Sequence, residues 1–358
     1  MKISILVSGF PPEFVGGTEI QTYNMAKILA KRHEVTVFTM AHPRRKKDEE
    51  IENFHIRRVG YLGLPALRYF SYIFNATREI GKNRGLIDVL QCMYISPNGV
   101  VGIIAKKLFG VPVVVFERGN RFYRRGGVFR LITKFVLKRA DRVLIQTSGQ
   151  KKELLSMYPE IPDSKIVVVP NGIDPEFPPN KTEGKCILYL GRLEEKKGVQ
   201  YLIEAYRKRG FKDRLLIIGD GPYRKELERL ASGLNVEFAG KIPNSKVGGF
   251  LRRGKIFVLP SLEEGFPTVL LEAMSVGLPL ISTRIVGMED IVKNGENGFL
   301  VEPGNPDELG EAIEKLLNDQ KLREMMGKRS LEEVKKYSWD GVILPLENIY
   351  HELVRRGC

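Results

Sequence analysis

Cysteine and tryptophan are scarce in this chain of 358 residues, which has three cysteines and one tryptophan. The cysteines, Cys92, Cys186 and Cys358, are odd in number and far apart in the sequence. This excludes a disulfide framework and the paired spacing of a zinc site, and it indicates a reducing, cytoplasmic environment.

Long apolar runs and common phosphate motifs are also absent. No run approaches the roughly 18–20 apolar residues of a membrane span. The N-terminal MKISILVSGFPPEF has a short apolar run followed by two prolines, so we expect a buried first strand rather than a signal peptide. The motif G-x-x-x-x-G-K-[ST] does not occur, and neither does D-x-D. We therefore expect no metal that bridges a bound diphosphate.

What remains is the composition of a globular α/β protein, with 43% hydrophobic and 28% charged residues. Short β-branched runs alternate with longer amphipathic stretches, a pattern typical of βαβ units around a parallel sheet. In the first half we expect helices over Thr18–Arg32 and Pro97–Phe109 and strands at KISILVS, EVTVFT, IDVLQC, VPVVVFE and RVLIQTS.

The same pattern restarts in the second half of the chain. We expect strands at CILYLG, RLLIIGD, NVEFAG, IFVLP and LPLIST, with helices over Val199–Arg209, Tyr223–Ser232 and Asp307–Leu317. The proline-rich segment between the halves indicates a linker. The predicted organisation is a Rossmann-like domain over 1–170, a linker over 171–184, a second Rossmann-like domain over 185–335 and a C-terminal helix over 336–358. Such domains place ligands at the carboxyl ends of their strands, here in a cleft between the two.

The net charge of +14 is concentrated in the first half. Residues 1–180 hold 28 Lys and Arg against 16 Asp and Glu, whereas residues 181–358 hold 29 against 27. An excess in one half predicts that this half meets an anionic partner. Solvated lysine and arginine faces are the alternative explanation.

Three glycine-containing stretches could bind a phosphorylated ligand. Gly16 and Gly17 follow the first strand, and Thr18 could cap the next helix, although such a pair is as common in plain turns. In LGRLEEKKG, Arg192 and Lys197 follow a strand, where a guanidinium can fork onto a diphosphate and a lysine adds a point charge. An exposed charged turn is the alternative there, and GDGP (Gly219–Pro222) alone indicates only a turn.

The segment EGFPTVLLE carries a carboxylate at each end, Glu264 and Glu272. A helix that begins near Pro267 would offer Gly265 and its first N–H groups to an anion. Glu272 lies among apolar neighbours, and burying a carboxylate without a partner is costly, so we expect it to accept the two hydroxyls of a ribose. Glu264 could accept hydroxyls of a sugar. A helix cap with a solvated glutamate is the alternative.

Together, GG-T-E, NGID, GR…KKG, GDGP, EGFPTVLLEA and NGENGFLVEPGN resemble the family-4 glycosyltransferases, which are retaining enzymes of the GT-B fold. The resemblance covers nearly the whole chain, and its most specific part is the E-x7-E pattern. It implies an acceptor-binding N-terminal domain, a nucleotide-sugar-binding C-terminal domain, and C-terminal helices that cross back to the first domain.

The resemblance also implies roles for single residues. Arg192 and Lys197 would hold the donor's phosphates, Glu272 the ribose and Glu264 the transferred sugar, while Gly16 and Gly17 close over the diphosphate. The remaining predicted donor contacts are Gly219, Lys241, Ile242, Gly265, Phe266, Pro267, Thr268 and Val269. The donor is expected to be a UDP-sugar, with a GDP-sugar second, and no cofactor or metal is predicted.

One position departs from the family. A histidine is common at the end of a strand in the middle of the N-terminal domain, and here VPVVVFERGN places Arg118 in that slot. Arg118 could contact a phosphate of donor or acceptor, and a salt bridge to Glu117 or Glu13 is the equal alternative.

The basic first half suggests a sugar, phospho-sugar or lipid-linked acceptor. The segment YLGLPALRYFSYIFNATREIGKNRG mixes aromatic and basic residues and could contact an anionic membrane surface; a buried helix with a basic outer side is the alternative. The predicted function is retaining hexosyl transfer in glycolipid or surface polysaccharide biosynthesis. A nucleotide-sugar epimerase or phosphorylase of the same fold is the second interpretation. A nucleic-acid-binding protein is the third, but the chain has no helix-turn-helix or RNA-binding signature.

Overall fold

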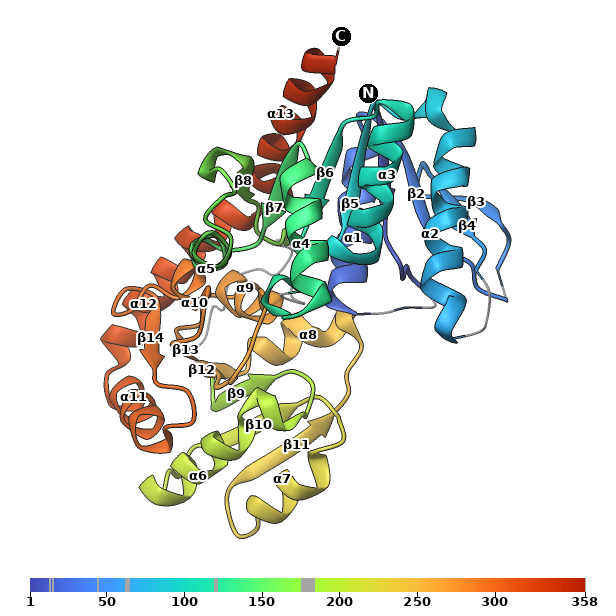
Figure 1. The fold of residues 1–358 in the computed structure, drawn as a ribbon. Helices are drawn as coiled ribbons and strands as arrows, with labels where there is room; N and C mark the ends of the chain where they lie inside the picture. Colours follow the sequence, from blue (N-terminus) through green and yellow to red (C-terminus); the bar gives the residue numbers. More distant parts are fainter. Residues whose placement is uncertain are drawn as a thin grey trace. The chain divides into compact units, whose positions relative to one another are not determined.

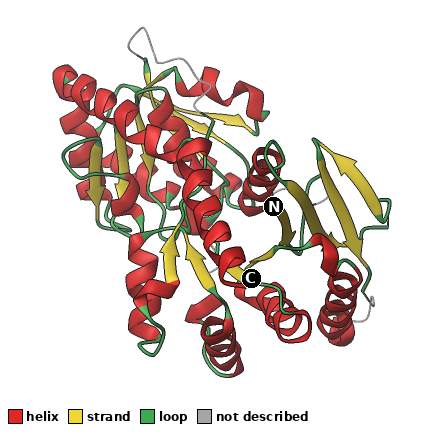
Figure 2. Ribbon diagram, turned by 90° about the horizontal axis from the view of Figure 1, so that it is seen from above, coloured by secondary structure: helices red, strands yellow, loops and turns green. Residues whose placement is uncertain are grey.

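The computed structural model describes residues 1–12, 14, 16–43, 45–61, 65–118, 122–174 and 184–357. Their contacts divide the chain into two compact units (Figure 1). The first contains Met1–Gly172 and Trp339–Cys358, and the second contains Ile173–Ser338. Figure 2 shows helices packed around the strands of each unit.

The first unit is built on an eight-stranded sheet with the order β3-β4-β2-β1-β5-β6-β7-β8. All neighbours are parallel except β3 and β4, which form an antiparallel pair at one edge. The strands are β1 (Lys2–Leu6), β2 (Glu34–Met40), β3 (Asp48–Ile51), β4 (Phe54–Val59), β5 (Val89–Met93), β6 (Val113–Phe116), β7 (Arg142–Ile145) and β8 (Ile166–Val168).

Helices cover both faces of this sheet, because successive strand residues point to opposite sides. Leu90 and Cys92 of β5 pack into a core with α2 (Pro65–Lys82), α3 (Val100–Phe109), α4 (Val128–Arg139) and α5 (Ser148–Met157). Val89 and Met93 pack into the opposite core with α1 (Gly17–Leu29) and the C-terminal α13 (Trp339–Gly357). The last helix of the chain is therefore part of the first unit.

The second unit has a six-stranded parallel sheet with the order β11-β10-β9-β12-β13-β14. Its strands are β9 (Cys186–Leu190), β10 (Arg214–Ile218), β11 (Val236–Gly240), β12 (Gly254–Leu259), β13 (Leu280–Thr283) and β14 (Gly298–Val301). Almost every residue of β9, β10 and β12 is buried in one continuous core, as expected for strands covered on both faces.

The helices of the second unit form two groups. In one, α6 (Val199–Arg209) packs against α7 (Arg224–Leu230) and α11 (Pro306–Asn318); in the other, α9 (Thr268–Ser275) packs against α8 (Asn244–Leu251) and α12 (Gln320–Glu333). The short α10 (Met288–Ile291) lies between β13 and β14.

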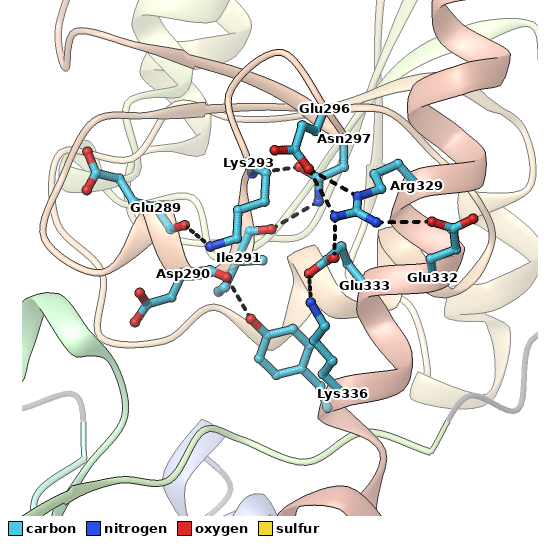
Figure 3. A network of polar contacts seen from close by, with 11 residues as sticks. Glu289, Asp290, Ile291, Lys293, Glu296, Asn297, Arg329, Glu332, Glu333 and Lys336 are labelled. Atoms are coloured by element: carbon cyan, nitrogen blue, oxygen red, sulfur yellow. Dashed lines mark hydrogen bonds and ion pairs between the residues drawn. The ribbon is translucent and has the colours of Figure 1, made fainter.

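A polar network ties the end of α12 to the segment between α10 and β14 (Figure 3). Arg329 forms ion pairs with Glu296, Glu332 and Glu333, and Glu333 also pairs with Lys336. Tyr337, in the 3-10 turn that follows α12, donates its hydroxyl hydrogen to the carbonyl of Asp290. The NGENGFLVEPGN motif contributes Glu296 to this network, so the motif has a structural role.

The observed elements differ from the predicted ones in specific places. The antiparallel pair β3–β4 was not predicted, and neither was β14. Helix α1 begins at Gly17 with Gly16 as its N-cap, so Thr18 lies inside the helix and does not cap it. Among the described residues, no helix is long and apolar enough to cross a membrane.

Candidate functional site

Three loops at the carboxyl ends of β9, β10 and β12 pack against one another through glycines. Gly219 has φ +135°, and a Cβ there would lie 1.9 Å from the carbonyl oxygen of Gly191. Gly198 has φ +69°, and a Cβ there would lie 1.9 Å from the carbonyl oxygen of Pro260. Because only glycine allows these approaches, the GDGP, LGR and KKG motifs are brought to one edge of the sheet.

The close approach of Gly198 to Pro260 places Lys197 beside Glu264. The Nζ atom of Lys197 lies 2.7 Å from Oε1 of Glu264, and both side chains are largely buried. The hydroxyl of Ser261 donates to the same oxygen at 2.8 Å. The backbone joins the two loops as well, since the N–H of Leu262 donates to the carbonyl of Lys196. A cation and a carboxylate from distant parts of the sequence thus share one site.

Arg192 extends from the first of these loops into solvent. Its side chain is 75% exposed, and Nη2 lies 2.8 Å from Oε1 of Glu194. The buried Tyr189 fixes the backbone beneath it by donating its hydroxyl hydrogen to the carbonyl of Arg192. An exposed guanidinium on a fixed backbone can turn toward an anionic ligand with little reorganisation.

The Gly265–Val269 segment leads into α9, which begins at Thr268 with Pro267 as its N-cap. The N-cap Pro267 makes no side-chain cap hydrogen bond, and α9 directly follows the loop that carries Glu264. Phe266 is buried, and its ring lies 5.8 Å from that of Tyr337. The polar network of Figure 3 therefore supports the loop that carries Glu264, because it holds Tyr337 in place.

Glu272 lies one turn further into α9 and is largely buried. Within the described part of the chain, its carboxylate has no hydrogen-bond or ion-pair partner. Burial alone raises its pKa from 4.5 to about 6. An unpartnered carboxylate in this position has both acceptor oxygens available for a ligand.

The structure thus brings Lys197, Glu264 and the start of α9 together, with Gly219 packed beneath the Arg192 loop. Lys241 and Ile242 follow β11, the edge strand of the sheet, with β10 between that strand and β9. Lys241 is exposed and Ile242 packs against the core.

The predicted site residues of the first unit lie after β1 and β6. Gly16 and Gly17 form the start of α1, and the carboxylate of Glu19 occupies the space next to Gly16, where a Cβ would lie 2.4 Å from it. The helix N-terminus has no side-chain cap. Glu19, an acid of the first turn, therefore lies beside this N-terminus.

Arg118 is buried rather than open to solvent, with 1% of its surface exposed. Its Nη1 donates to the side-chain oxygen of Asn171 at 2.9 Å, and its guanidinium stacks 4.0 Å from the ring centre of Phe116. Burial lowers its pKa to about 10, so it stays protonated at neutral pH. Nη1 therefore fixes the side chain to Asn171, whereas Nε and Nη2 are buried without a partner among the described residues.

Neither predicted salt bridge of Arg118 is seen among the described residues, and Glu13 lies outside them. Glu117 accepts the backbone N–H groups of Ile95 and Phe122 instead. Burial raises the pKa of Glu117 to about 7. This carboxylate fixes two loops at the carboxyl edge of the sheet.

Sequence reasoning missed three residues of the second unit's site. Ser261 binds Glu264, Gly198 sets the approach of the two loops, and Tyr337 supports Phe266. The KKG motif contains Gly198, a glycine between a charged turn and a helix. A glycine in that position indicates a left-handed backbone conformation. Ser261 and Tyr337 carry no signal, because their partners are distant in the sequence.

Comparisons with known proteins identify the family of the chain. The family described as "Glycosyltransferase Family 4" matches residues 15–177, and "Glycosyl transferases group 1" matches residues 173–333. An uncharacterized glycosyltransferase of Methanocaldococcus jannaschii is 29% identical over 360 residues, which cover 98% of this chain and 99% of that protein. The capsular polysaccharide biosynthesis glycosyltransferase CapM of Staphylococcus aureus is 30% identical over 293 residues, covering 72% of this chain and 75% of CapM. The chain belongs to glycosyltransferase family 4.

The fold agrees with this assignment. The structure of Anabaena HepE in complex with UDP superposes with a TM-score of 0.83 over 99% of this chain and all of that one, at 18% identity. At that identity the likeness shows the fold alone, which is GT-B with its two parallel-sheet α/β domains. The predicted family and fold are confirmed, and this family-4 enzyme is a glycosyltransferase rather than an epimerase or a nucleic-acid-binding protein.

The contact between Gly198 and Pro260 predicts the effect of adding one methyl group. Gly198 and Gly210 have similar left-handed φ values, +69° and +61°, but Gly210 has open space around it. Gly210→Ala should cost about 1–2 kcal/mol of unfolding free energy from φ alone. Gly198→Ala should cost roughly 1–3 kcal/mol more, because the added Cβ pushes the Pro260 backbone away. Urea denaturation followed by circular dichroism measures both, and equal losses would contradict the proposed contact.

The raised pKa of Glu272 predicts that the unfolding free energy of the unliganded protein depends on pH. A carboxyl whose pKa is 4.5 when unfolded and about 6 when folded loses stability as the pH rises between these values. Glu272→Gln removes this cost. The variant should match the wild type below about pH 4.5 and exceed it by about 1–2 kcal/mol above about pH 6.5. The exposed neighbour Glu263→Gln is the control and should show no such growing difference.

Proposed function

We propose that the protein transfers a hexose from a nucleoside-diphosphate sugar to an acceptor hydroxyl with retention of anomeric configuration. The observation that carries the proposal is Glu272, a largely buried carboxylate that has no partner among the described residues, eight residues beyond a glutamate bound by Lys197. Burying an unpaired carboxylate destabilises the protein, and such groups are typical of sites where a ligand supplies the missing hydrogen bonds. The vicinal hydroxyls of a ribose donate two hydrogen bonds and match its two oxygens.

The remaining residues fit the rest of the donor. Arg192 and Lys197 supply positive charge where the diphosphate would lie, and the uncapped N-terminus of α9 adds N–H donors. Glu264 would accept hydroxyls of the transferred sugar. We assign UDP as the preferred nucleotide and GDP as the second; HepE, which has the same fold, has been seen with UDP.

Transfer with retention follows from front-side attack. The bond between the anomeric carbon and the phosphate oxygen breaks, and its electron pair leaves with the diphosphate. The acceptor oxygen forms the new bond on the same face, and its proton passes to the departing phosphate oxygen. Lys197 and Arg192 would stabilise the charge that grows on the diphosphate, so this step needs no metal.

The acceptor is proposed to bind the first unit, which carries the excess of positive charge. A sugar, phospho-sugar or lipid-linked acceptor fits that charge. A place in polysaccharide or glycolipid assembly agrees with the similarity to CapM, which acts in capsular polysaccharide biosynthesis.

Nucleotide binding to Glu272 can be measured by thermal shift with UDP, GDP, ADP and CDP, with and without EDTA. A diphosphate at one hundred times its Kd should stabilise the wild type by about 2.7 kcal/mol, and EDTA should not change this. Glu272→Ala should weaken binding at least about tenfold, because two hydrogen bonds to a charged group are lost.

Glu263→Ala is the matched control, since Glu263 is an exposed acid of the same loop. It should keep the full shift. If no diphosphate stabilises the wild type, the assignment of the donor site is wrong; if EDTA abolishes the shift, metal independence is wrong.

The stereochemistry of the product tests the mechanism separately. The proton spectrum of the product formed from an α-linked nucleotide sugar should show an α linkage at the earliest time points. A β-linked product would rule out front-side transfer while leaving the donor site intact.

A further inference from the structure

The outward faces of α2 and α4 carry large apolar side chains in solvent. Phe70, Phe74 and Leu131 are 74%, 69% and 68% exposed. Of the fourteen exposed large apolar side chains among the described residues, eight lie on these two helices: Leu67, Tyr69, Phe70, Phe74, Val128, Phe129, Leu131 and Phe135. Exposed apolar groups gathered in this way mark an interaction surface.

The two helices show the same pattern. Leu67, Phe70 and Phe74 recur at i, i+3 and i+7 on α2, and Val128, Leu131 and Phe135 do so on α4. Each helix buries its other stripe on the same face of the first unit's sheet, with Tyr72 and Ala76 on α2 and Val136 and Leu137 on α4. The exposed stripes therefore point in one common direction, away from that sheet.

The position of the stripes along the helices is also informative. In a parallel βαβ unit each helix runs opposite to its strands, so it begins near their carboxyl ends. All six stripe residues fall in the first two thirds of their helices. Figure 1 shows α2, α3 and α4 side by side, and α3 contacts both of the others. The apolar surface thus adjoins the edge of the sheet where ligands of α/β domains bind.

The charge around this surface is uniformly positive on α4. Residues 122–140 hold six cations and no acid: Arg124, Arg125, Arg130, Lys134, Lys138 and Arg139. Two of them are neutralised, since Arg124 pairs with Glu153 and Lys134 with Glu160. Arg139 lies 4.4 Å from the ring centre of Phe135, and Arg125 lies 5.5 Å from that of Phe129. Cations are therefore interleaved with exposed aromatic rings.

We propose that the α2–α4 surface docks on an anionic phospholipid bilayer. Aromatic and aliphatic side chains enter the boundary between headgroups and acyl chains, and the arginines and lysines bind lipid phosphates. The membrane-docking proposal rests on the function proposed above and specifies the acceptor class. A docked first unit meets an acceptor presented by the membrane, which is a lipid-linked sugar or phosphosugar.

A second copy of the chain is the other occupant that an apolar face could have. A two-fold pairing would place the same patch on both subunits, so the cations that Glu153 and Glu160 do not neutralise would face each other. Like charges brought together in this way oppose association. An anionic bilayer has the complementary charge, and we commit to it.

The test is co-flotation of the full chain with vesicles. The wild type should float with vesicles of phosphatidylcholine containing about one third phosphatidylglycerol, bind pure phosphatidylcholine at least about tenfold more weakly, and be partly released by salt. The double variants Phe70→Ser with Phe74→Ser, and Leu131→Ser with Phe135→Ser, should each lose at least about tenfold in partitioning.

Two single variants are matched controls. Leu344→Ser changes a side chain that is 57% exposed on α13, on the opposite face of the same sheet, and Met325→Ser changes one that is 54% exposed in the second unit. Both should float like the wild type. The proposal is overturned if the wild type does not bind anionic vesicles, or if the controls lose as much as the double variants. It is also overturned if the wild type sediments as a dimer that the double variants abolish.

The same variants separate this proposal from the donor site. Nucleotide-dependent thermal stabilisation should be unchanged in the double variants, since Glu272 and Lys197 lie in the second unit. Stabilisation by UDP without vesicle binding would leave the donor proposal standing and reject the membrane surface. Vesicle binding without stabilisation by any nucleotide would leave the membrane surface standing and reject the donor proposal.

Discussion

The close approach of three strand-ending loops in the second unit is the constraint on which the rest of the site depends. A carbonyl oxygen occupies the place where a Cβ of Gly198 would lie, and another does so at Gly219. Without those approaches the loops after β9, β10 and β12 would separate by the width of a methyl group or more. Lys197 and Glu264, 67 residues apart in the sequence, would then not meet at 2.7 Å. The glycines of these motifs act through the backbone, and the charged residues depend on them.

The two glutamates of one motif have opposite surroundings. Glu264 is neutralised by Lys197 and by the hydroxyl of Ser261, so its burial is compensated within the protein. Glu272 is largely buried eight residues later and has no such partner in the part of the chain that the structure describes, and its pKa rises to about 6. The free protein is destabilised by this carboxylate, whereas a ligand with two hydroxyl donors would remove the cost. Local instability of this kind is typical of functional sites, where stability is sacrificed for binding.

The sequence predicted elements well where local signals define both ends. Helix α6 runs over Val199–Arg209 as predicted, because the left-handed Gly198 and Gly210 bound it. The start of α1 was placed wrongly at Thr18, since a glycine can be an N-cap without a side-chain signal. Strand β3, Asp48–Ile51, escaped prediction because DEEI is acidic and lacks alternation. The role of Arg118 could not be read from its position after a strand, since its burial against Asn171 depends on a partner 53 residues away.

Net charge alone did not identify a partner, because part of the basic excess of the first unit serves its own fold. Lys106 donates to the carbonyl of Arg139 and Lys165 to that of Lys138, so two lysines satisfy the free carbonyls at the end of α4. Arg58 likewise forms an ion pair with Glu49 within the first unit. The remaining cations are informative through their location. Arg125 and Arg139 lie over the exposed rings of α4, and neither forms a salt bridge with a described residue. Charge therefore becomes evidence for a partner only after the structure has shown which cations the fold already uses.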